Sequence, residues 1–329
     1  MKLLISSDTH FSDNSRDTYR FGLFPWFAKQ QEIYKVDGTF LLGDICEQKN
    51  NHSAELVNSI IDGLKLLKPP IFILKGNHDY IREDLPFFKF LNRIKGITFC
   101  TEPTLLEEFH VLMVPHQLNQ IALDKALQMA PDNWLVFAHQ TMSGAVSETG
   151  ARLTGLIVPS NCKAKALYSG DVHVPQILNS PNSTVVYIGA PYHVRFGDTY
   201  RPRILLLDNK HSTDLHYPAP RKLTLTIRDV SELKDLDKSD QVKVTLELPR
   251  SEAVEWANHK KSIIDYCKAK GVEVYGTELK VEQLRKRPRL DENTSSGKGN
   301  SEYFEAFCRA EKIPIQIKKS GIMLLVGEN

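Results

Sequence analysis

Short apolar segments that predict buried strands recur through the first two thirds of the chain. They alternate with segments whose apolar residues recur at helical spacing. The predicted strands are Lys2–Ser6, Thr39–Leu42, Ile71–Leu74, Val111–Val114, Trp134–Ala138, Ala166–Ser169, Val185–Ile188 and Ile204–Leu207. The predicted helices are Pro25–Tyr34, Ser53–Leu67, Leu85–Arg93 and Gln120–Met129. Strands that are apolar on both faces and alternate with helices predict a layered α/β fold, and the strand spacing after residue 100 favours mixed sheets.

The pattern changes after Pro218-Ala219-Pro220. The segments that follow predict a β-α-β arrangement, and hence a small second α/β domain. They are a strand at Lys222–Ile227, an alternating run at 242–248, a helix at Glu252–Lys270 and a strand at Val272–Tyr275. Residues 289–301 are small and polar, as is typical of a linker. We therefore expect three segments, at 1–218, 219–285 and 286–329.

Composition narrows the class of protein. The 329 residues are 41% hydrophobic and 25% charged, which excludes a disordered or collagen-like chain. Forty-two Lys and Arg against 40 Asp and Glu leave a net charge of +2, so any binding of anions must come from a local patch or a metal. The five cysteines are scattered and never spaced as C-x-x-C, which predicts neither a disulfide framework nor a thiolate metal site. We also expect no membrane span, because no segment approaches about 20 apolar residues.

Metal-binding residue types follow the predicted strands at the points where these end. They are Asp8 and His10, then Asp44, then Asn77, His78 and Asp79, then His139, and finally Asp171 and His173. In an extended segment, residues two apart face the same side, so each Asp-x-His pair can reach one point. A single Asp or His of this kind is usually a cap or a structural group. Five such groups at strand ends predict a common site.

The donor set indicates the chemistry of that site. Without His78 and Asp79, the set holds three Asp, three His and one Asn, which offer oxygen and imidazole ligands without thiolate and suit Mn, Fe or Zn. This set is too large for one catalytic ion that also holds water. It suits two ions that share a carboxylate, and two ions about 3.5–4 Å apart can stabilise both oxygens of an in-line phosphoryl displacement.

These motifs resemble the calcineurin-like metallophosphoesterases. The resemblance covers roughly the first 200 residues and rests on Asp8-x-His10, Gly43-Asp44, Gly76-Asn77-His78-Asp79, His139 and Gly170-x-x-His173. Pro175-Gln176, Tyr187-Ile188-Gly189-Ala190-Pro191 and Phe196-Gly197-Asp198 are similar to the SbcD-type DNA repair nuclease subunits. The resemblance implies a four-layer αββα sandwich with a small α/β capping domain. The segments would then be a nuclease domain (1–218), a DNA-capping domain (219–285), and a polar linker with a partner-binding tail (286–329).

The resemblance also implies roles for single residues. Asp8, His10, Asp44 and His173 would hold one divalent ion. Asp44, Asn77, His139 and Asp171 would hold the other, with Asp44 bridging. His78 would be the general acid that protonates the leaving oxygen, and Asp79 would orient it.

Asp171 departs from the family pattern, which has Gly-His-x-His where this chain has Gly170-Asp171-Val172-His173. With three carboxylates the formal charge of two divalent ions and their ligands is +1, where a histidine at 171 would leave +2. We expect a harder second site that prefers Mn²⁺, or Mg²⁺, to Zn or Fe. The alternative is an impaired second site that has lost its metal.

The expected activity is Mn²⁺-dependent exonuclease or endonuclease hydrolysis of DNA in repair, recombination or replication. The resemblance implies a homodimer that works with an SbcC-like ATPase of the SMC family. The scattered cysteines predict buried thiols in a reducing cytoplasm, that of the host if the chain is phage-encoded. Arg195, Arg201 and Arg203 are candidates for DNA backbone contact, or equally for a solvated loop. Two alternatives stay open: an enzyme of the same superfamily that acts on small phosphodiesters or phosphoproteins, and a non-catalytic scaffold.

Overall fold

The computed structural model describes residues 1–179, 183–209, 211–281 and 308–309. By its internal contacts the chain divides into two compact units. The first comprises residues 1–247 and 255–280, and the second comprises 248–254 and 281–329. In the second unit, a turn is closed by the backbone N–H of Glu252, which donates to the carbonyl of Pro249. The predicted linker and tail at 286–329 lie outside the described residues, apart from Cys308 and Arg309. The domain boundaries at 218 and 285 stay predictions.

Two mixed sheets, each of six strands in the described part of the chain, form the centre of the first unit. The first sheet has the order β12-β11-β1-β2-β3-β4, and the second has the order β5-β6-β7-β8-β10-β9. The strands of the first are β1 (Lys2–Ser6), β2 (Gly38–Leu41), β3 (Ile71–Leu74), β4 (Ile97–Cys100), β11 (Ile204–Asp208) and β12 (His211–Leu215). Those of the second are β5 (Thr104–Leu106), β6 (Val111–Val114), β7 (Leu135–His139), β8 (Ala166–Gly170), β9 (Gln176–Asn179) and β10 (Thr184–Tyr187). Strands β1 to β4 run parallel, as do β6, β7, β8 and β10.

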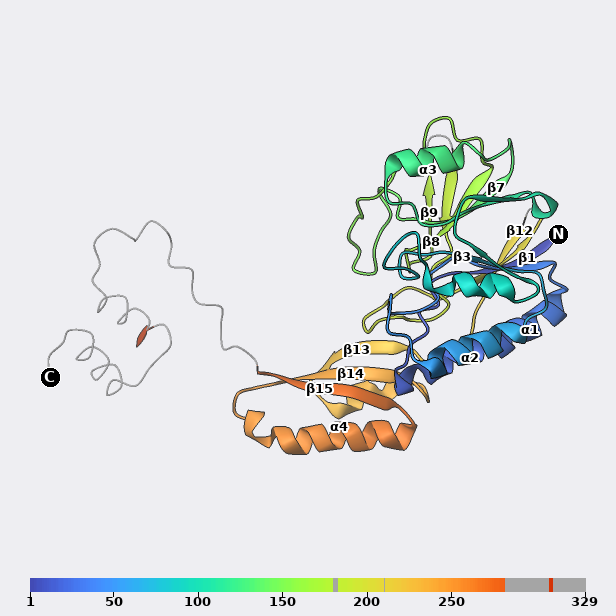
Figure 1. Cartoon of the computed structure of the whole chain (residues 1–329). Coiled ribbons are helices and arrows are strands. Elements are labelled where there is room, and N and C mark those ends of the chain that lie inside the picture. The colour runs from blue at the N-terminus through green and yellow to red at the C-terminus, as the bar shows by residue number, and fades with distance from the viewer. Residues whose placement is uncertain (180–182, 210, 282–307, 310–329) are drawn as a thin grey trace, which may run out of the picture. The chain divides into compact units, whose positions relative to one another are not determined.

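Helices cover the outer faces of both sheets and complete four layers. Helices α1 (Leu23–Tyr34) and α2 (Ala54–Lys65) lie on the side of the first sheet, and α3 (Gln120–Leu127) lies on the side of the second (Figure 1). Strand β1 shows why the layers form, because its successive side chains point to opposite faces. Leu4 packs with Phe24 and Ile60 of the helices, whereas Leu3 and Ile5 pack between the two sheets. The predicted αββα sandwich is confirmed.

The strands that the sequence pattern did not predict are β4, β5, β9 and β12. All four stand at the edges of the two sheets. An edge strand is covered on fewer sides, so its apolar pattern can be weak, as in the mostly exposed β12, whereas the edge strand β4 is mostly buried. The helix predicted at Leu85–Arg93 is wrong in type. It is a 3-10 helix, Phe87–Arg93, that begins after the extended Pro86.

A three-stranded sheet follows residue 220 and has the order β13-β14-β15. Its elements are β13 (Lys222–Ile227), β14 (Gln241–Leu248), α4 (Trp256–Lys270) and β15 (Glu273–Val281), and Figure 1 shows α4 alongside the sheet. The buried Lys222 ammonium lies 2.8 Å from a carboxylate oxygen of Asp17, which belongs to a 3-10 helix, Ser15–Gly22. The Gln241 side chain donates to the carbonyl of Arg16 in the same helix. This added module is therefore tied to the segment that directly follows His10. No helix in the described part of the chain is long and apolar enough to span a membrane.

Candidate metal centre

The two sheets bring the predicted metal ligands to one place. Asp8 and His10 follow β1, Asp44 follows β2, and Asn77 and His78 follow β3 in the first sheet. His139 ends β7, and Asp171 and His173 follow β8 in the second sheet. These strands run parallel within their sheets, so their carboxyl ends meet at a common edge. Three groups of residues could each hold an ion there, because the ligand atoms within each group lie within 4.8 Å of one another. The groups are Asp8, His10 and His173; His10, Asp44 and His78; and Asp8, Asp44 and His139.

The backbone is held in unusual conformations at these positions. Asp8, His10, Asp44 and Asp171 all have positive φ, between +43° and +77°. Such angles are uncommon outside glycine and cluster at functional sites, where surrounding contacts enforce them. Here the backbone N–H groups of Asp8 and His10 donate to the carbonyls of Gly43 and Asp44. The loops after β1 and β2 therefore hold each other in place.

Glycines allow the strand ends to approach His139 closely. Gly43 has φ +92°, and a Cβ atom there would lie 2.5 Å from Nδ1 of His139. A Cβ atom on Gly170 would lie 2.9 Å from the same nitrogen and 1.9 Å from Oγ of Ser7. The motifs Gly43-Asp44 and Gly170-Asp171 thus need glycine for space, and at Gly43 also for its backbone angle.

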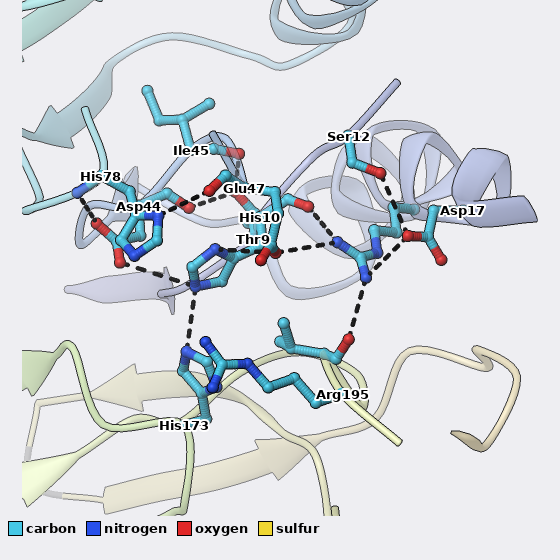
Figure 2. A network of polar contacts seen from close by, with 12 residues as sticks. Thr9, His10, Ser12, Asp17, Asp44, Ile45, Glu47, His78, His173 and Arg195 are labelled. Carbon is cyan, nitrogen blue, oxygen red and sulfur yellow. Dashed lines mark hydrogen bonds and ion pairs between the residues drawn. The ribbon is translucent and has the colours of Figure 1, made fainter. Parts of the chain in front are cut away.

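The side chains at the centre fit a pair of divalent cations. Nε2 of His10 and Nε2 of His173 point toward each other and are 3.1 Å apart (Figure 2). Metal–nitrogen bonds of about 2.1 Å place two neighbouring ligands about 3 Å apart on one ion. Oδ2 of Asp8, Oδ1 of Asn77 and Nε2 of His139 are buried without a hydrogen-bond partner among the described residues. Buried polar atoms without partners are costly, so this set of oxygen and imidazole donors is suited to bound cations.

Charge is distributed unevenly over these ligands. Burial would raise the pKa of the Asp44 carboxyl, but His139, His10 and His78 beside it hold that pKa well below its ordinary range. Burial raises the pKa of Asp8 to about 6. Burial opposes the charged form of His139, yet Asp44 and its other acidic neighbours hold the pKa of His139 well above its ordinary value. Asp44 is therefore the most firmly ionised carboxylate at the centre.

His78 is positioned by hydrogen bonds at two points. Its Nδ1 is 2.7 Å from the carbonyl oxygen of Glu47, and its backbone N–H donates to Oδ1 of Asp44 at 2.9 Å. The carbonyl requires a proton on Nδ1, so the second proton of a charged ring would be on Nε2. The half-buried ring lies edge-on to His10 at 5.1 Å between centroids. This arrangement can present an Nε2 proton to a group bound at the centre.

Among the described residues, the Asp79 carboxylate bonds to the backbone and not to the His78 ring, so its expected role in orienting His78 stays a prediction. The Asp79 carboxylate is fully buried and accepts the backbone N–H groups of Gly76, Asp44 and Ile45, at 2.7 to 3.0 Å. It therefore joins the loop after β3 to the loop after β2. The carbonyl of Glu47 is what holds the His78 ring, and Asp79 acts on it only through the backbone.

Asp171 lies beside the group that contains His139. Its Oδ1 is 3.8 Å from Nε2 of His139, and its Oδ2 accepts the hydroxyl of Thr141 at 2.5 Å. Its backbone N–H donates to Oδ1 of Asp8. The three groups of ligand atoms found among the described residues do not include Asp171. Its role as a ligand of the second ion stays a prediction.

Replacing Asp171 with histidine is expected to keep activity and to shift the metal preference from Mn²⁺ toward Zn²⁺. The physical reason is the exchange of a hard oxygen donor for imidazole. We expect a shift of roughly tenfold in relative affinity, equivalent to about 1.4 kcal/mol. Competition titrations of both ions against wild type measure it. Thr141→Val removes the hydrogen bond to Asp171 but keeps its carboxylate, and should leave the preference unchanged. An unchanged preference in Asp171→His would contradict the assignment.

Three charged residues at the centre were missed by sequence reasoning. Oε2 of Glu47 lies 3.4 Å from Nδ1 of His10, and Oε1 of Glu148 lies 3.0 Å from Nδ1 of His173. The buried Arg20 guanidinium donates to the carbonyl of His10 and pairs with Asp17 at 3.2 Å. The contact with His173 lowers the pKa of Glu148 to about 2. None of the three stands at the end of a strand, so the local pattern carried no signal for them.

The three predicted DNA-contacting arginines are in different surroundings. Arg195 is exposed beside the centre, near His173 in Figure 2, and its charge helps to lower the pKa of Glu148. Arg201 lines a cavity of about 370 Å³ with Tyr192, Tyr200 and Tyr217. Arg203 donates to the carbonyls of Ile188 and Tyr187 and pairs with Asp214. The donors of Arg203 are used within the fold, whereas Arg195 and Arg201 are exposed, and DNA contact by these residues stays a prediction.

Comparison with known proteins identifies the family of the first half of the chain. Residues 1–175 match the family described as calcineurin-like phosphoesterase. A search of curated proteins returns no match.

Several solved structures are similar to this chain in part. An archaeal phosphodiesterase has 16% sequence identity and a TM-score of 0.38, over 65% of this chain and 99% of that one. A dimetal phosphatase from Danio rerio has 10% identity and a TM-score of 0.40, over 66% and 99%. A phosphopantetheinyl hydrolase from Mycobacterium tuberculosis has 11% identity and a TM-score of 0.36, over 58% and 90%.

Proposed function

The chain belongs to the calcineurin-like phosphoesterase family, and from this premise we propose that it is a metal-dependent nuclease that hydrolyses phosphodiester bonds in DNA. Asp8, His10, Asp44 and His173 hold one divalent ion in this proposal. Asp44, Asn77, His139 and Asp171 hold the second, and Mn²⁺ is the proposed metal. Two such ions, when bound, supply charge stabilisation to the attacking and leaving oxygens of an in-line displacement.

The residues of the chain have separate tasks in the proposed reaction. His78 donates its Nε2 proton to the leaving oxygen, while the carbonyl of Glu47 keeps the ring in place. Asp44 is held ionised by its histidine neighbours and also accepts the backbone N–H of His78. This bond links the position of the acid to that of the shared carboxylate. Arg195, at the exposed side, is placed to meet a phosphate of the substrate.

We propose DNA as the substrate because the Phe196-Gly197-Asp198 turn contacts the module that follows residue 220. The Phe196 and Tyr275 rings are 4.6 Å apart. The guanidinium of Arg16 lies over Tyr275 at 4.5 Å, and the ammonium of Lys243 lies over Phe196 at 4.8 Å. Lys243 is exposed, as is Arg16, which also pairs with Glu273 at 3.3 Å, and Phe196 directly follows Arg195. Cations interleaved with aromatic rings suit a nucleic-acid strand better than a small phosphodiester.

The proposed partners are a second copy of the chain and an SbcC-like ATPase. Support for self-association comes from the segment 81–87, which follows the His78 loop. Ile81 is 62% exposed, Leu85 is 65% exposed and Phe87 is 41% exposed. Neighbouring exposed apolar side chains of this size are typical of interaction surfaces. The proposed ATPase contact through residues 286–329 falls almost entirely outside the described residues.

Digestion of end-labelled duplex DNA tests the proposed substrate. We expect the purified chain to cut DNA with Mn²⁺ and to lose this activity in EDTA, with recovery when Mn²⁺ is restored. A parallel assay uses bis-p-nitrophenyl phosphate, and metal analysis accompanies both. Hydrolysis of this small diester with none of DNA would favour the small-molecule phosphodiesterase. Inactivity on both substrates, with fewer than two bound ions, would favour the scaffold.

A further inference from the structure

Glu148 is placed against the outer nitrogen of a predicted metal ligand. Its Oε1 is 3.0 Å from Nδ1 of His173, while Nε2 of His173 faces His10 across the centre. The His173 side chain is 9% exposed and that of Glu148 is 26% exposed. The pair is thus largely shielded from water, which strengthens an electrostatic contact.

The loop that carries Glu148 is held by several hydrogen bonds. The Gln176 side chain accepts the backbone N–H of Val146 and donates to the carbonyl of the same residue, both at 2.8 Å. The backbone N–H of Ser147, just before Glu148, donates to the carbonyl of Ala151, beyond it, and so closes the loop around Glu148. The sequence pair Pro175-Gln176 therefore fixes the segment that delivers the carboxylate. These bonds fix the backbone on both sides of Glu148, so its carboxylate is delivered to His173 from a held loop.

We propose that Glu148 is a positioning residue that orients His173 and sets the affinity of the first of the two cation sites. This inference rests on the proposed metal centre. A carboxylate against Nδ1 of His173 favours a proton on that nitrogen, so the lone pair of Nε2 is directed into the centre. The negative charge also makes the imidazole a stronger donor, and loss of such a partner typically weakens metal binding by about 10–100-fold.

Glu47 provides an internal comparison at the second histidine of the same site. Its Oε2 is farther from Nδ1 of His10, at 3.4 Å, and its side chain is 37% exposed. It also lies 3.9 Å from the guanidinium of Arg20, which offsets its charge. The carbonyl of His10 is meanwhile held by Arg20 itself. We therefore expect a smaller contribution from Glu47 than from Glu148.

Titration with Mn²⁺ alone, followed by the electron paramagnetic resonance of free Mn²⁺, tests the inference without an activity assay. We expect Glu148→Ala to weaken one of the two bound equivalents by about 10–100-fold. Glu148→Gln, which keeps an oxygen acceptor without the charge, should give a smaller loss, as should Glu47→Gln. His173→Ala should lose that equivalent. Asp132→Asn removes a surface charge before β7, at the far end from His139, and should bind as wild type.

The outcomes separate the inference from the proposed function. Wild-type affinity in Glu148→Ala, together with loss of one equivalent in His173→Ala, would overturn the role of Glu148 and leave the metal centre intact. Failure of the wild-type chain to bind Mn²⁺ would overturn both. Thermal unfolding of each variant in EDTA checks folding without metal. If Glu148→Ala does not fold, the Mn²⁺ affinity of Glu148→Gln tests the inference instead. An unchanged Mn²⁺ affinity in Glu148→Gln would contradict it.

Discussion

Replacing Asp44 with asparagine is expected to abolish phosphodiester hydrolysis and to reduce the bound metal below two ions per chain. Asp44 belongs to two of the three groups of ligand atoms at the centre, with Oδ2 3.7 Å from His10 and Oδ1 3.3 Å from His139. Asparagine keeps the size of the side chain but offers one oxygen and no charge. Several kcal/mol of transition-state stabilisation are expected from the ions, and 1.4 kcal/mol is about tenfold in rate. The expected loss is therefore on the order of 10³-fold or more.

Paired measurements of rate and metal content check this prediction. Asp62→Asn is a matched control, because Asp62 is 76% exposed and pairs only with Lys65 on the surface of α2. That variant should keep both its ions and its rate. An Asp44→Asn chain with two bound ions and near wild-type turnover would show that Asp44 is not the shared ligand.

Replacing His78 with alanine is expected to slow cleavage of DNA by about 10²–10⁴-fold, the usual contribution of a general acid. The metal content should change little, because the predicted role of His78 is proton donation and not ligation. Its Nδ1 is committed to the carbonyl of Glu47, which leaves Nε2 as the donor. The measurement is the single-turnover rate on duplex DNA, with bound metal counted in the same preparation.

The leaving group distinguishes proton donation from simple disturbance of the site. Nitrophenolate leaves readily without a proton, so His78→Ala should retain far more of its activity on bis-p-nitrophenyl phosphate than on DNA. His211→Ala, on the exposed strand β12, is the matched control and should behave as wild type on both substrates. Equal losses on the two substrates would remove His78 from the role of general acid.

The positions of the predicted ligands followed from local pattern because strand ends are encoded locally. Short runs such as Ile71–Leu74, bounded by Pro and Gly, favour buried strands, and the residues that follow them leave the sheet at its edge. For this reason the hydrophobic pattern was sufficient to place Asp8, Asp44 and His139 together. Chemical type then favoured oxygen and imidazole ligation, and the family match to residues 1–175 agrees with the motifs at these strand ends.

The contacts of Asp79 show where local pattern was insufficient. Its neighbour in sequence is His78, so a direct contact was the natural expectation. The structure instead directs its carboxylate to the backbone of residues 44, 45 and 76. The partners at residues 44 and 45 reach Asp79 because the parallel strands β2 and β3 bring their following loops side by side. The sequence around Asp79 does not indicate this contact.

The amino-acid sequence alone determined the layered α/β fold and the set of residues gathered at the ends of its strands, because burial and residue chemistry act over a few neighbouring positions. Only the tertiary structure decided which groups support that set. Glu148 meets His173 across 24 intervening residues, Lys222 meets Asp17 across more than 200, and Arg20 holds the carbonyl of His10. These contacts form because tertiary packing brings the segments together, and the local hydrophobic pattern does not predict them.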